Sequence, residues 1–225
     1  MSEKQSLMQR NNIIRAAVMG ANDGILSVSG IILGVAGATS NTGTILLAGF
    51  AGTLAGTVSM AMGEYVSVSS QHDAQEKVRL QQTEALEKDF DSEFKFVQQK
   101  YENAGISEDL AKQATSEMMT NDPLVTTVRE RFGFSLDNIL SAKDASLASL
   151  ISFPVGSILP MLAMYLSPIN IRELLTFFAV TVALVITGYV AAHLNGADKK
   201  HASIRNVLSG IFTMIVTFTI GSLFR

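Results

Sequence analysis

The fold is decided by one apolar stretch: residues 16–38 read AAVMGANDGILSVSGIILGVAGA. A helix needs roughly 20 mostly apolar residues to cross the hydrocarbon core of a bilayer, so this stretch is long enough to span it. A single carboxylate, Asp23, interrupts the stretch. A charged side chain at the centre of a membrane helix costs roughly 2.5 to 3.5 kcal/mol on insertion scales and is rarely placed there without a function. We therefore predict that Asp23 binds an ion or carries a proton.

Four further windows are apolar enough to cross a membrane: Thr44–Gly63, Ala145–Leu166, Leu174–Leu194 and Val207–Phe224. The sequence thus predicts an all-α membrane protein with five transmembrane helices. Between the second and third spans lies a polar segment that holds most of the acidic residues and no window able to span. The expected organisation is residues 1–70 with a tail and two spans, residues 71–143 as a helical acidic insert, and residues 144–225 with three spans.

Lysine and arginine beside the spans predict the orientation, because such residues are enriched in cytoplasmic loops. They concentrate before the first span, in the insert, and between the fourth and fifth spans: Lys4, Arg10, Arg15, Lys77, Arg79, Lys199, Lys200 and Arg205. The link at residues 39–43 carries no charge, and the link at residues 167–173 carries only Arg172 and Glu173. We therefore expect a cytoplasmic N-terminus, a cytoplasmic insert and a C-terminus on the outside.

The insert itself shows helical patterning. Its apolar positions Leu86, Phe90, Phe94, Val97 and Tyr101 repeat at helical spacing and predict one amphipathic helix. Further along, Asp122-Pro123 is typical of a helix start, and Gly133 marks the expected end of that helix. About three packed helices are expected here.

The second span offers partners for Asp23. Met60 and Glu64 are four residues apart and therefore share one helix face. Two carboxylates and a thioether suit a borderline divalent ion such as Fe(II) or Mn(II) better than Mg or Ca. Each residue also has a structural alternative, since Met60 could simply pack and Glu64 could extend to the lipid headgroups.

The glycines of these spans allow two interpretations. The pairs Gly20/Gly24, Gly30/Gly34 and Gly52/Gly56 allow close helix packing, within the chain or across a dimer. Asn22-Asp23-Gly24 could also loosen the first helix and free backbone carbonyls toward an ion path.

Other classes of chemistry find no support. The chain has no cysteine, which removes disulfides and thiolate ligands. It shows no nucleophile–base pair, phosphate-binding loop or zinc protease motif, so neither an enzyme nor a permanent cofactor is expected. The net charge is −3, and the expected partners are membrane lipid, metal ions and protons rather than nucleic acid. One alternative remains, a non-transporting membrane scaffold whose acidic insert binds a partner.

Two runs carry a resemblance, RAAVMGANDG at residues 15–24 and GTVSMAMGEYVSVSSQ at residues 56–71. They resemble the vacuolar iron transporter family in its bacterial branch, and the likeness covers nearly the whole chain. It implies a homodimer in the plasma membrane, with a pore that is formed between the subunits by the first two spans. It further implies export of Fe(II), and often Mn(II), from the cytosol in exchange for protons, for metal homeostasis. By motif position, Asp23 matches the family's intramembrane aspartate and Met60 its pore methionine.

The insert departs from that pattern. The resemblance implies metal-collecting glutamates on the insert's helices, but the early pair falls on Gln82 and Ala85 and the late position near Arg131. Glu93 retains one such position, while its expected partner lies near Phe96. Four other acids either substitute or form a solvated acidic surface: Glu76, Glu84, Glu87 and Glu130.

Overall fold

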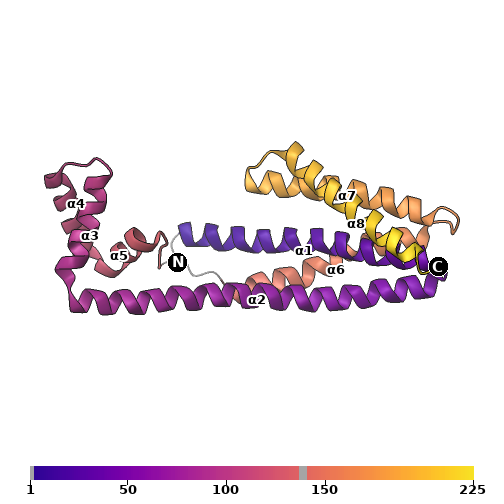
Figure 1. Cartoon of the computed structure of the whole chain (residues 1–225), viewed down its shortest axis with the longest axis horizontal. Helices are drawn as coiled ribbons and strands as arrows, with labels where there is room; N and C mark the ends of the chain where they lie inside the picture. Colours follow the sequence, from indigo (N-terminus) through magenta and orange to yellow (C-terminus); the bar gives the residue numbers. More distant parts are fainter. Residues whose placement is uncertain (1–2, 137–140) are drawn as a thin grey trace. The chain divides into compact units, whose positions relative to one another are not determined.

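The computed structural model describes residues 3–136 and 141–225, with side chains from Gln9 onward, and all regular structure in this part is α-helical. Five helices are long and apolar enough to cross a membrane: α1 (Glu3–Ala38), α2 (Thr42–Lys88), α6 (Ala142–Leu166), α7 (Arg172–Asn195) and α8 (Lys199–Ser222) (Figure 1). The prediction of an all-α membrane protein with five spanning helices is confirmed. Residues 137–140 of the expected insert lie outside the described residues.

The chain separates into two compact units. One unit, here called the membrane unit, comprises Arg10–Val66 and Ser141–Arg225. The other, here called the insert unit, comprises residues 3–9 and 67–136 of the described part of the chain. Helix α2 is continuous through the change of unit and has 47 residues, more than twice the roughly 20 that a span needs.

The membrane unit is packed around α1. Its buried core joins residues of all five long helices: Ile25, Val28, Ile32 and Leu33 of α1, Ile45 of α2, Phe153 and Met164 of α6, Val180, Ala183 and Leu184 of α7, and Met214 of α8. Helices α7 and α8 lie side by side (Figure 1). Membrane helices gain little hydrophobic drive from one another and associate through close packing, so the fit of these side chains holds the unit together.

Helices α1 and α6 approach each other backbone to backbone. A Cβ atom added at Gly24 would meet the carbonyl oxygen of Phe153, and one added at Gly156 would meet the carbonyl oxygen of Ala21. Only glycine leaves room for this contact, which is the known use of small residues in membrane helix pairs.

The glycine pair of the second half of α1 also packs within the chain. A Cβ at Gly30 would lie 3.1 Å from the Cγ2 of Thr213, and one at Gly34 would lie 3.3 Å from the carbonyl oxygen of Thr217. Both threonines belong to α8. The faces of Gly30 and Gly34 are therefore occupied by α8 of the same chain rather than left free for a dimer contact.

Arg172, at the start of α7, is buried with 1% of its surface exposed. Its guanidinium donates hydrogen bonds to the Oγ1 of Thr42 at 2.8 Å and to the carbonyl oxygen of Ser40 at 3.0 Å, and it pairs with Glu173 at 3.2 Å. This arginine therefore connects the start of α7 to the α1–α2 link. It therefore acts as a structural clamp, although the sequence suggested only an ordinary loop charge.

The insert unit contains three short helices, α3 (Phe90–Asn103), α4 (Glu108–Asn121) and α5 (Pro123–Phe132), which pack on one another. The predicted stripe from Leu86 to Tyr101 does not lie on one helix, because α2 ends at Lys88 and α3 starts anew. The Asp89 carboxylate accepts a hydrogen bond from the backbone N–H of Ser92 at 3.0 Å and caps the new helix. That prediction of a single helix was wrong.

Helix α5 begins and ends as predicted. Asp122 accepts a hydrogen bond from the N–H of Val125 at 2.9 Å, and Pro123 occupies the first turn. Gly133 ends the helix in the left-handed conformation, with φ of 76°, which favours glycine.

Glu130 joins α5 to α3. Its carboxylate pairs with Lys100 at 3.0 Å and with Arg129 at 2.8 Å, and it accepts a hydrogen bond from the Tyr101 hydroxyl at 3.0 Å. Burial raises the pKa of this carboxyl, but the hydrogen bonds from Lys100, Arg129 and Tyr101 outweigh burial and hold its pKa below the ordinary value. The charged form of Glu130 therefore stabilises the insert unit.

We predict that Glu130→Gln lowers the melting temperature of the insert unit at neutral pH. A carboxyl with a lowered pKa adds stability above its ordinary pKa, and this contribution is lost as the pH falls through the folded-state pKa. The acid limb of the wild-type stability curve, below the ordinary pKa of 4.5, should therefore flatten in the variant. Thermal unfolding followed by circular dichroism from about pH 3 to about pH 7 measures both effects. Glu84→Gln, at an exposed position, is the control and should behave as wild type.

We also predict that Gly156→Ala lowers the melting temperature of the detergent-solubilised protein. The added methyl forces α6 away from the carbonyl of Ala21, and overpacking of this kind costs about 1 to 3 kcal/mol. Gly63→Ala is the matched control, because nothing lies within 4 Å of a Cβ at that position. Equal melting temperatures for the two variants would contradict the close approach of α1 and α6.

Candidate functional site

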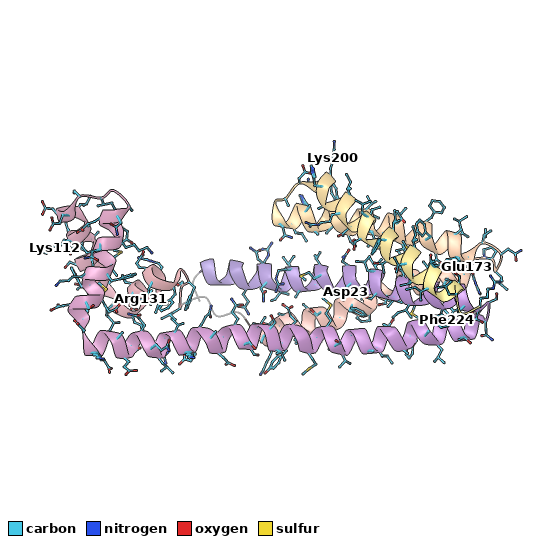
Figure 2. The ribbon with its side chains drawn as sticks, viewed as in Figure 1. Asp23, Lys112, Arg131, Glu173, Lys200 and Phe224 are labelled. Carbon is cyan, nitrogen blue, oxygen red and sulfur yellow. The ribbon has the colours of Figure 1, made fainter. Side chains whose placement is uncertain are left out.

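Asp23 is half-buried in the middle of the apolar part of α1 (Figure 2). The hydroxyl of Ser27, one turn further along the same helix, donates a hydrogen bond of 2.6 Å to its Oδ1. A hydroxyl donor orients the carboxyl group and brings no positive charge to it. Asp23 thus lies inside an apolar helix, where a carboxylate is costly to insert and a bound cation would reduce that cost.

The residues on either side of Asp23 fix the rotation of α1. The Oδ1 of Asn22 accepts hydrogen bonds from the Thr187 hydroxyl of α7 at 3.1 Å and from the Asn206 amide of α8 at 2.8 Å. Gly24 packs on the backbone of α6. Because successive residues of a helix point about 100° apart, Asp23 is directed away from both of these contacts.

Helix α1 is continuous through this region, from Glu3 to Ala38. The hypothesis that Asn22-Asp23-Gly24 loosens the helix is therefore wrong. The physical reason is that the Asn22 side chain bonds to α7 and α8 instead of competing for the backbone of its own helix, and Gly24 is held against α6.

Glu64, on α2, is paired with Arg15 of α1. The Nη2 of Arg15 lies 2.7 Å from the Oε1 of Glu64, and the carboxylate side chain is 14% exposed. Arg15 precedes Asp23 by eight residues, so Glu64 meets α1 roughly 12 Å along the helix axis from Asp23. The two carboxylates thus lie at two separate levels of the membrane unit.

Met60 is half-buried and packs against the hydrophobic core of the membrane unit. Its thioether is one helical turn from Glu64 on α2, as the sequence indicated. The packing role that was left open for this residue is therefore present in the structure, and a ligand role remains a prediction.

In the insert unit, Glu93 is held by protein groups. Its carboxylate accepts hydrogen bonds from the Nη2 of Arg131 at 2.9 and 3.0 Å and from the amide of Gln82 at 2.7 Å. The guanidinium of Arg131 also lies 3.8 Å from the ring centroid of Phe96, within range of a cation–π interaction. Three of the positions at which the resemblance led us to expect other residues, Gln82, Phe96 and Arg131, therefore form one cluster with Glu93.

The remaining acids of the insert do not converge. Glu76 is paired with Arg79 at 2.7 Å, and Glu130 is held by the contacts described above. Glu84 and Glu87 are exposed. Across residues 3–136 and 141–225, no group of three or more His, Cys, Asp or Glu side chains is placed to hold a metal ion.

Two residues of this site were not recognised from sequence. Arg15 was used only to predict orientation, and Asn22 only as a possible helix breaker. The signal for Arg15 was its position immediately before the apolar stretch, which gives its level at the membrane boundary but not the helix face on which it lies. For Asn22, the signal was an amide inside an apolar helix, which usually bonds across to a neighbouring helix.

Comparisons with known proteins cover nearly the full length of the chain. The sequence is 32% identical over 224 residues to vacuolar iron transporter homolog 5 of Oryza sativa subsp. japonica, covering 99% of this chain and 86% of that protein. It is 29% identical over 220 residues to vacuolar iron transporter homolog 2.1 of Arabidopsis thaliana, covering 96% and 83%. It is 29% identical over 215 residues to VIT-like transporter 1b of Glycine max, covering 94% and 76%. The family model described as the VIT family matches residues 14–222, and the chain therefore belongs to the VIT family.

Proposed function

We propose that this protein exports Fe(II), and also Mn(II), from the cytosol in exchange for protons. It is a multi-pass membrane protein and, by its family, a transporter rather than an enzyme. The observation that carries the proposal is Asp23, a carboxylate inside a membrane helix whose partner is the Ser27 hydroxyl rather than a protein cation. The names of the relatives support iron as the cargo.

The donor chemistry supports a transition metal. Asp23 and Glu64 offer carboxylate oxygens at two levels, and Met60 offers a thioether on α2. A thioether favours borderline ions such as Fe(II) over Mg and Ca, while carboxylates also accept Mn(II). In this mechanism the ion passes from Glu64 to Asp23, with Met60 on the route.

Proton exchange follows from the low dielectric around Asp23. When the metal ion leaves, the carboxylate is without a counter-ion, and such an environment favours its protonated form. A proton taken up from the outside would then be released to the cytosol when the next ion binds. The placement of lysine and arginine supports the required orientation, with a cytoplasmic N-terminus and Arg225 outside.

Assembly as a homodimer is part of the proposal. One face of α2 exposes large apolar side chains at every fourth position, Phe50, Leu54, Val58 and Met62, each more than half exposed. Such a stripe suits either lipid or the same helix of a second copy. A dimer joined along α2 would place the ion path at its interface.

The insert, in this proposal, attracts cations without storing them. Glu76, Glu93 and Glu130 are already paired with arginine or lysine, and Glu84 and Glu87 are exposed. Exposed charges raise the local cation concentration but lack a preorganised ligand set.

We predict that Asp23→Asn lowers Fe(II) and Mn(II) flux into proteoliposomes by at least about tenfold, the factor that corresponds to 1.4 kcal/mol of lost interaction. The amide keeps the volume and removes the charge. Asp73→Asn, the same change at an exposed position of α2, is the control and should transport as wild type. Near-wild-type flux in Asp23→Asn would place the central site elsewhere.

The same assay tests the coupling and the scaffold alternative. Collapsing the pH gradient should slow metal flux and abolish the accompanying proton movement. Wild-type liposomes that move no metal, together with capture of a protein by the insert, would favour the scaffold instead.

For the insert, we predict that Glu84→Gln/Glu87→Gln leaves the number of tight Mn(II) sites on the full chain unchanged. The double variant should reduce metal flux at low ionic strength only. At about 0.15 M salt, the interactions of exposed charges are largely screened beyond roughly 8 Å. Calorimetry and flux at two salt concentrations measure this. Loss of a tight, salt-insensitive site in the variant would show that the insert does bind metal.

A further inference from the structure

Two oxygen atoms and one sulfur atom, all of types that bind metal ions, lie around the guanidinium of Arg15. Its Nη2 lies 2.7 Å from the Oε1 of Glu64 and donates to the Oδ1 of Asn12 at 3.0 Å, while its Nη1 lies 3.4 Å from the sulfur of Met19. A carboxylate, an amide oxygen and a thioether thus surround one positive charge. The guanidinium marks a position where this part of the membrane unit already accommodates a cation.

The sequence explains why these donors meet. Asn12, Arg15 and Met19 are spaced three and four residues apart, so they share the face of α1 that meets Glu64 of α2. Asn12 is buried at 9% exposure, and the Glu64 side chain is 14% exposed. The Arg15 side chain is 45% exposed. The two oxygen donors are therefore fixed, whereas the cation between them is able to swing toward solvent.

We infer that Asn12, Met19 and Glu64 form an entrance site for a divalent transition-metal ion, and that Arg15 occupies it as a tethered cation until such an ion displaces it. The inference rests on the proposed transport function for its place in the path, though not for the binding itself. The mixed oxygen and sulfur donors suit borderline and soft divalent ions.

Arg15 would also provide selection by charge. Its guanidinium remains protonated at any working pH, so Glu64 is not left unpaired in the resting state. A monovalent ion gains from Glu64 no more than the attached arginine does, whereas a divalent ion gains about twice the Coulomb energy at equal distance. Only a divalent ion therefore has a clear advantage over Arg15, and Arg15 returns to Glu64 once the ion has moved on toward Asp23.

The test measures equilibrium binding of Co(II), Mn(II) and Cd(II) to the full chain in detergent by calorimetry. Arg15→Gln should bind Co(II) about fivefold more tightly than wild type, because a partly exposed ion pair worth up to about 1 kcal/mol no longer competes. Arg10→Gln removes the same charge from an exposed position on α1 and should leave the affinity unchanged. The gain should vanish in Arg15→Gln/Glu64→Gln. Met19→Leu should weaken Cd(II) binding more than Mn(II) binding, since only the softer ion profits from sulfur.

The inference is overturned if Arg15→Gln binds Co(II) no more tightly than wild type, or if Arg10→Gln gives the same gain. If Arg15→Gln does not fold, Arg15→Lys replaces it. An ammonium keeps the charge but does not bridge all three donors at once, so a smaller gain is expected, and none would again overturn the site. Because these are binding measurements, a wild-type protein that binds with the expected pattern but moves no metal would refute the transport function and leave the site standing.

Discussion

The close approach of α1 to α6 is the constraint on which the rest of the membrane unit depends. At Gly24 and Gly156 each helix meets the carbonyl oxygen of the other, so neither is able to rotate or slide without a steric clash. With α1 held there, Asn22 bonds to α7 and α8, and Asp23 is left on the remaining side of the helix. The direction of the Asp23 carboxylate is therefore a consequence of backbone packing rather than of contacts made by Asp23 itself.

Three arginines show how this protein handles buried or partly buried negative groups. Arg172 is buried, donates hydrogen bonds to two oxygens of the α1–α2 connection and pairs with Glu173, so it is a permanent part of the fold. Arg131 is fixed by both Glu93 and the ring of Phe96. Arg15 differs, because it is nearly half exposed while its partner Glu64 is mostly shielded. Of the three arginines, Arg15 has the most exposed side chain, and it is therefore the one that we infer an incoming cation displaces.

Features that depend on local sequence were predictable. The five spans follow from apolar length, Asp23 from its position within an apolar run, and the bounds of α5 from Asp122 and Gly133. The apolar stripe from Leu86 to Tyr101 predicted one helix where the structure has two. Apolar periodicity takes no account of a capping side chain such as Asp89, which accepts a hydrogen bond from a backbone N–H and starts a new helix.

Pairings across long separations were not predictable, because they depend on the relative rotation of helices. Glu64 and Arg15 are 49 residues apart, and no local pattern indicates that their faces meet. The sequence indicated only that Arg172 is a charged residue in a loop, because a sequence does not show which side chains are buried.

The two carboxylates of the membrane unit differ in the kind of partner they have, and in the proposed transport mechanism this difference would give the ion path a direction. Glu64 pairs with the guanidinium of Arg15, whereas Asp23 accepts a hydrogen bond from the Ser27 hydroxyl. A divalent ion that displaces Arg15 would form a stronger pair with Glu64 than arginine does, but only after the existing ion pair is broken. It gains more by moving to Asp23, where no pair has to be broken. In the proposed exchange, release from Asp23 would require a competitor for the carboxylate, and a proton is a competitor that neutralises it. The difference between the two partners would then link entry by displacement of a cation to exit by protonation.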